Sequence, residues 1–288
     1  MNELKNRIIH LNFLTKMEDK IFWTLRIAAG FCFIGHGAFG IITKSEWLPF
    51  FAFAHIGSDM AYNLMPLIGM MDILLGMLAI FYPTRIFFMW MTVWAIWTAL
   101  LRPFTGMGIW EFFERAGNYG IPLVMLMWVG LPSSFKAAFR KIEIVKLSNS
   151  RYQLIQFTLR IVIALLLLGH GGFGAFQQKT ILISHWQTVG MPGPFMGSEG
   201  WLQLIGWFEI ILAFRILVKP GKGILIFAIM WKIGTELLYP LSGSPIWEFV
   251  ERWGSYFSPL ALFFIIQWQQ IDHQKRVQYV LATKGGLT

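Results

Sequence analysis

Residues 24–40 read TLRIAAGFCFIGHGAFG, and residues 158–174 read TLRIVIALLLLGHGGFG. Nine of these 17 positions coincide at an offset of 134 residues. Two further segments repeat at an offset of 137: residues 103–122 read PFTGMGIWEFFERAGNYGIP, and residues 240–259 read PLSGSPIWEFVERWGSYFSP, with 11 of 20 positions identical. Because rare residues such as His, Trp and Arg coincide, the pattern predicts that one structural unit is present twice.

The composition is typical of a chain that lies in lipid. Of its 288 residues, 56% are hydrophobic and 14% are charged, and the mean hydropathy is +0.57. A soluble domain has about a quarter of its residues charged. The single Cys excludes a disulfide within the chain. These numbers predict a multi-pass membrane protein.

The apolar stretches define the expected spans. A helix needs roughly 20 apolar residues to cross the hydrocarbon core. Eight stretches are candidates: 21–43, 61–82, 84–101, 118–135, 154–177, 198–218, 222–239 and 255–270. We therefore expect an all-α integral membrane fold of eight transmembrane helices, built as two parallel four-helix repeats with pseudo-two-fold symmetry about the membrane normal.

The repeat also gives the expected division of the chain. Residues 1–20 form a cytoplasmic N-terminal segment, 21–137 the first repeat, 138–153 a cytoplasmic linker, 154–270 the second repeat and 271–288 a cytoplasmic tail.

The distribution of Lys and Arg predicts the orientation. Fifteen of them fall on the side of the two termini and five on the opposite side. The excess of positive charge lies on the cytoplasmic side of membrane proteins, so both termini are expected in the cytoplasm, in a bacterial cytoplasmic (inner) membrane. The net charge of +9 is then explained by topology and by contact with anionic head groups of the bilayer. Nucleic acid is not an expected partner.

Each repeat places a His and a carboxylate at similar depth in neighbouring helices: His36 with Asp72, and His170 with Glu209. Ionisable groups inside a membrane cost about 2.5–3.5 kcal/mol on insertion scales, so they need a reason. A hydrogen-bonded pair that joins the two helices is one reason. A proton relay to a quinone, a set of iron or manganese ligands and a haem pair are the functional alternatives.

Further polar residues are candidates for cofactor binding. Two repeated segments at the outer face have Glu and Arg at i,i+4, which favours a helical ion pair and leaves one acid of each segment over. One face of 222–239 has a Lys and a Glu that the first repeat replaces with Ala95 and Ala99. Arg26 and Arg160 lie near cytoplasmic helix ends, where snorkelling to lipid phosphates explains them. The remaining candidates are Trp110, Glu111, Glu114, Arg115, Lys232, Glu236, Trp247, Glu248, Glu251 and Arg252.

The chain resembles the DoxX/DoxD-like membrane proteins. The resemblance is carried by Leu25-Arg26-Ile27, Gly35-His36-Gly37 and Asp72 in the first repeat. The second repeat has Leu159-Arg160-Ile161, Gly169-His170-Gly171 and Glu209 in the same order. The resemblance implies a tandem fusion of two four-helix units. It also implies a membrane subunit of a redox system, such as thiosulfate:quinone oxidoreductase or thiol and superoxide detoxification complexes.

Three functions follow as hypotheses. In the leading one, the chain is a quinone-linked redox subunit with its polar site toward the outer face, where it meets a protein partner. His36, His170, Asp72 and Glu209 would carry protons. A transporter for a small solute or ion would use the same acids, with Lys232 and Glu236 as a gate. A membrane assembly factor without chemistry would use only the outer surface.

Overall fold

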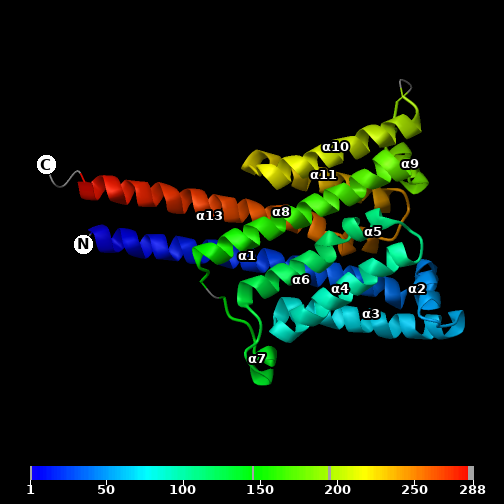
Figure 1. Ribbon diagram of the computed structural model, residues 1–288, viewed down its shortest axis with the longest axis horizontal. Helices are drawn as coiled ribbons and strands as arrows, with labels where there is room; N and C mark the ends of the chain where they lie inside the picture. The colour runs from blue at the N-terminus through cyan, green and yellow to red at the C-terminus, as the bar shows by residue number, and fades with distance from the viewer. Residues whose placement is uncertain (1, 145, 194–195, 285–288) are drawn as a thin grey trace.

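The structure, a computed structural model, describes residues 2–144, 146–193 and 196–284. It is helical, and no β-strand occurs among these residues. Figure 1 follows the chain through its helices, which are α1 Asn2–Ile41, η1 Ser45–Trp47, α2 Leu48–Phe53, α3 Ser58–Phe81, α4 Arg85–Phe104, α5 Ile109–Glu114, α6 Ala116–Val129, α7 Phe135–Phe139, α8 Asn149–Gly172, η2 Phe173–Gln177, α9 Thr180–Thr188, α10 Ser198–Val218, α11 Lys222–Leu241, α12 Trp247–Glu251 and α13 Trp253–Lys284.

Six helical segments within the described residues are long and apolar enough to cross a membrane, so the chain is a multi-pass membrane protein. They are Met17–Ile41, Ser58–Phe81, Arg85–Phe104, Asn149–Gln177, Ser198–Val218 and Lys222–Leu241. The other two expected spans lie on α6 and α13. Helix α6 has 14 residues, which at 1.5 Å per residue rise about 21 Å. That is less than the hydrocarbon core of roughly 30 Å.

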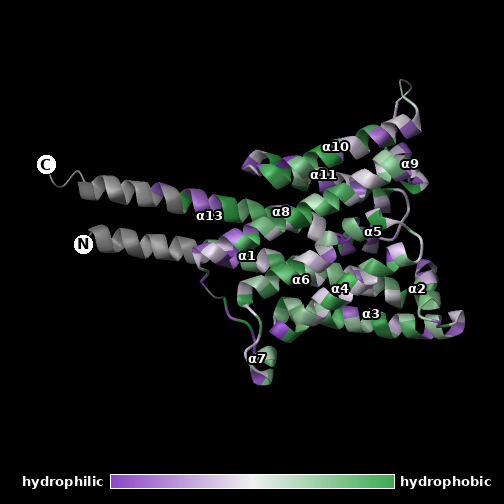
Figure 2. Ribbon diagram, viewed as in Figure 1, coloured by the Kyte–Doolittle hydropathy of each residue, from purple (hydrophilic) through white to green (hydrophobic). Residues whose placement is uncertain are grey.

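The apolar helices have two different faces. On α3 one face is buried and carries Ala61, Gly69 and Ala79. Its opposite face carries exposed Leu67 and Leu74. An exposed apolar face of this extent is suited to lipid. In Figure 2 the green of hydrophobic residues recurs along α3 and α8.

The turn between α3 and α4 and the turn between α10 and α11 are closed in the same way. Helix α3 ends before Pro83, and α10 ends before Pro220, as expected where the residue before a proline leaves the helical region. Arg26 donates hydrogen bonds to the carbonyls of Ala79 and Ile80 at the end of α3. Arg160 does the same for Leu217 and Val218 at the end of α10. These arginines therefore satisfy helix-terminal carbonyls that lack a partner within the helix.

The two ends of the molecule hold different elements. Helices α1 and α13 pack side by side, and both termini lie at one end of the molecule (Figure 1). The short helices α2, α5 and α9 lie at the opposite end (Figure 1). There α5 packs on α8, and α12 packs on α1, so each short segment contacts the first long helix of the other half.

Candidate functional site

The first half brings its His and its carboxylate together. Nδ1 of His36 lies 2.8 Å from Oδ2 of Asp72, which is completely buried. The close approach of α1 and α3 makes this contact. A Cβ on Gly37 would meet the backbone of Gly69 and a side chain of α3, so only glycine fits there. The predicted helix-joining pair is therefore present between α1 and α3.

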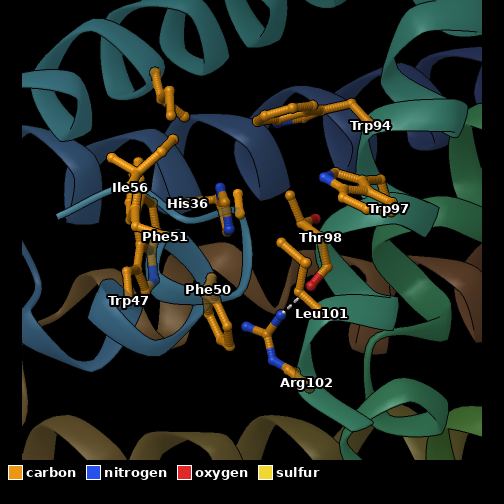
Figure 3. A pocket seen from close by; sticks show the side chains of 12 residues that line it. His36, Trp47, Phe50, Phe51, Ile56, Trp94, Trp97, Thr98, Leu101 and Arg102 are labelled. Carbon is orange, nitrogen blue, oxygen red and sulfur yellow. Dashed lines mark hydrogen bonds between the residues drawn. The ribbon is translucent and has the colours of Figure 1, made fainter. Parts of the chain in front are cut away.

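A cavity of about 190 Å³ lies beside His36. Figure 3 shows its wall, to which α2 contributes Phe50 and Phe51 and α4 contributes Trp94 and Trp97. The Trp47 ring stacks on the His36 imidazole, with ring centroids 4.7 Å apart. The polar groups that complete the lining are His36, Thr98 and Arg102. The arrangement is an apolar aromatic pocket with a few placed donors, as expected of a small-molecule site.

Arg102 is poorly neutralised for a buried guanidinium. One nitrogen donates to the carbonyl of Thr98 over 2.9 Å. Its ion pair with Glu111 is long, at 3.7 Å from Nε to Oε2. The other oxygen of Glu111 already accepts a hydrogen bond from Lys179 at 2.5 Å. Arg102 thus retains donor capacity at the edge of the cavity.

The second half does not repeat the His–carboxylate pair, and here the prediction of a His170–Glu209 contact is wrong. Nε2 of His170 lies 3.0 Å from Glu236 and 3.6 Å from Glu114. Glu209 instead accepts a hydrogen bond from Nε1 of Trp231 at 2.9 Å and lies 3.8 Å from Nζ of Lys232. The physical reason is the extra buried charge, because Lys232 and Glu236 pair at 2.8 Å and draw both groups toward themselves.

A second cavity lies beside His170, but its volume is only about 30 Å³. That is far below the roughly 150 Å³ that holds a benzene-sized ring. Many of its lining residues are equivalent in the repeat to residues that line the larger cavity. Arg102 is replaced by Tyr239, and Phe50 by His185. Other equivalent pairs of lining residues are His36 with His170, Ile68 with Ile205, Thr98 with Thr235 and Leu101 with Leu238.

The segments around α5 and α12 form ion pairs across the two halves. Arg115 contacts Glu251 at 2.6 Å, and Arg252 contacts Glu114 at 3.2 Å. All four side chains are buried. The acids predicted to be left over in each segment therefore join one half to the other.

Lysines at the ends of α1 and α8 add a second reciprocal set. Lys44 contacts Glu248 at 2.5 Å, and Lys179 contacts Glu111 at the same distance. Each lysine follows the first long helix of its half, and its glutamate belongs to the other half. These lysines and Arg102 were not among the predicted site residues, although Lys44 and Lys179 stand at similar places after the two GHGxFG motifs.

These ion pairs between the halves form a network that holds its members in charged form. Burial alone raises the pKa of the Glu114 carboxyl, but the neighbouring Arg115 and Arg252 outweigh it and hold that pKa well below its ordinary value. The Glu248 carboxyl is also subject to burial, yet Arg252 and Lys44 bring its pKa down to about 2. For Arg252 the burial effect is outweighed by Tyr239 and Glu248, so its pKa is raised well above the ordinary value.

One of the two predicted ion pairs within a segment is present, and one is not. Arg252 contacts Glu248 at 2.6 Å, as i,i+4 spacing predicts. Arg115 does not pair with Glu111, because Glu111 is occupied by Lys179 and Arg102. In the second half Tyr239 replaces Arg102 and leaves Glu248 available. The sequence alone does not reveal this competition, since it depends on residues of other helices.

The two tryptophans of these segments pack across the halves. Trp110 stacks on Phe176, with ring centroids 5.4 Å apart. Trp247 packs against the apolar cluster of Phe39, Trp47 and Met65. Neither contributes to the lining described for the larger cavity, so they contribute to packing.

The predicted metal ligands are not gathered in one place. Among the side chains that the structure describes, no three His, Cys, Asp or Glu lie together in a way that would hold a metal ion. Arg26 and Arg160 lie on helix-end carbonyls as described above. Comparison with family models, with curated proteins and with solved structures finds no match for this chain.

Proposed function

We propose that the chain is a DoxX-like membrane subunit of a redox system, and that the cavity beside His36 binds a quinone. The single observation that carries this proposal is the aromatic cavity with a buried His–Asp pair at its wall. A cavity of roughly 150 Å³ is enough for a benzene-sized ring. The volume of about 190 Å³ therefore leaves room for one substituted ring.

The residues present fit such a ring. Trp47, Phe50 and Trp94 offer aromatic surfaces for stacking. Arg102 and His36 offer donors for carbonyl oxygens on the ring. Trp97 is 43% exposed on the outside of α4, so a ligand dissolved in lipid is able to approach the cavity from the membrane.

A bound quinone would supply two-electron redox chemistry, and the chain supplies proton handling. Nδ1 of His36 is engaged with Asp72, which leaves Nε2 for the cavity. His36 is then able to give its Nε2 proton to a ligand oxygen while Nδ1 receives a proton from Asp72. The imidazole stays neutral overall, and the proton lost is the one from the carboxyl group.

We also propose how the spans are arranged in the membrane. Two parallel four-helix repeats about a pseudo-two-fold axis are supported by the reciprocal contacts Arg115–Glu251 with Arg252–Glu114 and Lys44–Glu248 with Lys179–Glu111. The proposed eight spans require that α6 and α13 cross the membrane in addition to the six long apolar helices. Both termini would lie on the cytoplasmic side of a bacterial inner membrane. The excess of Lys and Arg on the side of the termini supports this orientation. A protein partner would bind at the outer face, near the short helices α2, α5 and α9.

The test is quinone titration of the purified protein in lipid nanodiscs, read as quenching of tryptophan fluorescence. Trp47, Trp94 and Trp97 line the cavity, so a short-chain quinone is expected to quench them saturably. His36→Ala is expected to weaken binding at least tenfold. The matched control is His185→Ala, which removes a histidine from the smaller cavity of the second half. Equal binding by both variants would contradict the proposal.

A further inference from the structure

The two halves differ most in what surrounds their mid-depth carboxylates. Asp72 and Glu209 are equivalent in the repeat, 137 residues apart. Glu209 lies 3.8 Å from the ammonium group of Lys232, which also contacts Glu236 at 2.8 Å. Both Lys232 and Glu236 are almost completely buried. Nε of Arg252 lies 3.1 Å from Oε2 of Glu236. Two buried cations, Lys232 and Arg252, therefore neutralise the two acids of the second half.

The first half has no such cation. Ala95 and Ala99 stand where the second half has Lys232 and Glu236. A small cavity of about 10 Å³ lies beside Ala95, His36 and Asn118, which is close to the least volume that accepts one water molecule. Apart from His36, no charged side chain among the described residues forms an ion pair with Asp72.

One oxygen of Asp72 has no charged partner. Oδ2 contacts His36, whereas Oδ1 is buried and has no hydrogen bond of ordinary geometry within the described residues, and the uncharged indole of Trp94 on α4 is a further donor that faces this carboxyl group. A buried carboxylate without compensation is costly and takes up a proton instead. The 2.8 Å contact between Oδ2 of Asp72 and Nδ1 of His36 is the position where that proton fits.

The helices packed against α3 bring few other ionisable groups to this place. Helix α1 contributes His36 and, one turn away, Cys32. Helix α2 has no ionisable residue. The arginines of these helices are engaged elsewhere: Arg26 on the end of α3, Arg85 on carbonyls after α6, and Arg102 on Thr98 and Glu111.

We propose that Asp72 carries an exchangeable proton in the first half, and that Lys232 takes the place of this proton in the second half, where it keeps Glu209 ionised. The chain then has one mid-depth site for proton uptake and release, in the half with the larger cavity. This proposal goes beyond quinone binding, because it concerns the protein without ligand.

Infrared spectroscopy of the ligand-free protein in nanodiscs tests it. A protonated carboxyl group has its own C=O stretching band, which shifts in D₂O. Near neutral pH the wild type is expected to show such a band. Asp72→Asn is expected to abolish it, and Glu209→Gln, the equivalent substitution, is expected to leave it unchanged. Absence of the band in the wild type, or its loss in Glu209→Gln rather than Asp72→Asn, would overturn the proposal.

A variant that is expected to gain a carboxyl band provides the second test. Lys232→Met removes the ammonium group but keeps a similar volume, so an acid of the second half is expected to become protonated and add a second band. An unchanged spectrum in a folded Lys232→Met protein would contradict the role of Lys232. Thermal unfolding of each variant establishes that it is folded. Because no ligand is used, the infrared experiment and the quinone titration are independent. Either one is able to contradict its own proposal while the other supports its proposal.

Discussion

Glu114 shows how a single buried residue connects the two halves. Its carboxylate contacts Arg115 at 2.8 Å and Arg252 at 3.2 Å, and it is 4% exposed. Removing one partner of a buried ion pair leaves the other as an uncompensated charge, which is more costly than the pair is stabilising. The network at this end of the molecule is therefore sensitive to the loss of any one member.

Glu114→Gln is expected to lower the free energy of unfolding by about 3–5 kcal/mol, because Arg252 and Arg115 lose a charged partner. The control is Glu46→Gln, since Glu46 is exposed and its carboxylate accepts a hydrogen bond from its neighbour Ser45. Thermal unfolding in detergent compares the two. If both variants unfold at the same temperature as the wild type, the network does not join the halves.

The acid limb of the stability profile is expected to depend on Glu248. Its pKa is lowered from an ordinary 4.5 to about 2. A group whose pKa is lowered on folding stabilises the protein above its unfolded pKa and loses that contribution as pH falls toward the folded pKa. Stability is therefore expected to decline as pH falls from 4.5 toward 2. Glu248→Gln should flatten part of this decline, and an identical profile for the variant would be inconsistent with the ion pairs described.

At the scale of elements, α5 and α12 occupy tight places against the opposite half. A Cβ on Gly35 of α1 would meet the backbone of Glu251, and one on Gly169 of α8 would meet the backbone of Glu114. Backbone atoms move less readily than side-chain ends, so both glycines permit the close approach of the short segment. These contacts also position the ion pairs between the halves.

Gly35→Ala and Gly169→Ala are both expected to destabilise the protein, because each new methyl group displaces the short helix beside it. Gly234→Ala in α11 is the matched control, since nothing lies within 4 Å of a Cβ there. Alanine favours a helix over glycine by about 1 kcal/mol, so the control should be neutral or slightly stabilised. Unfolding curves that rank the three variants equally would contradict the packing described.

The sequence predicts elements better than it predicts contacts. The repeated segments and apolar stretches correctly indicated helices and a membrane protein. The pair His36–Asp72 could be predicted because neighbouring helices carry both residues at one depth. His170 could not be placed in the same way, because Glu236 of α11 and Glu114 of α5 compete for it.

The cavity beside His36 was not predictable either. Its volume depends on side chains of α2 and α4 whose relation to α1 no short-range pattern records. The tryptophans at 90, 94 and 97 have a helical spacing that is typical of packing, yet Trp94 and Trp97 line the cavity. A stripe of aromatic residues at helical spacing fits both roles, and only the packing of the neighbouring helices distinguishes them.

At the scale of the whole molecule, two similar halves have different interiors. The first half has a cavity of about 190 Å³ beside a His–Asp pair. The second half has a cavity of about 30 Å³ and a neutralised charge cluster. The reciprocal ion pairs keep the halves together, so the first half is the expected place for a ligand and the second for structural support.

The most direct test is quinone analysis of the protein as purified from membranes, combined with its visible spectrum. We expect close to one quinone per chain in the wild type. His36→Ala and the cavity-filling variant Thr98→Phe should both lose it. Glu46→Gln, on the exposed surface, should retain it. A wild-type protein free of quinone, or equal quinone content in all four proteins, would contradict the assignment of the first-half cavity.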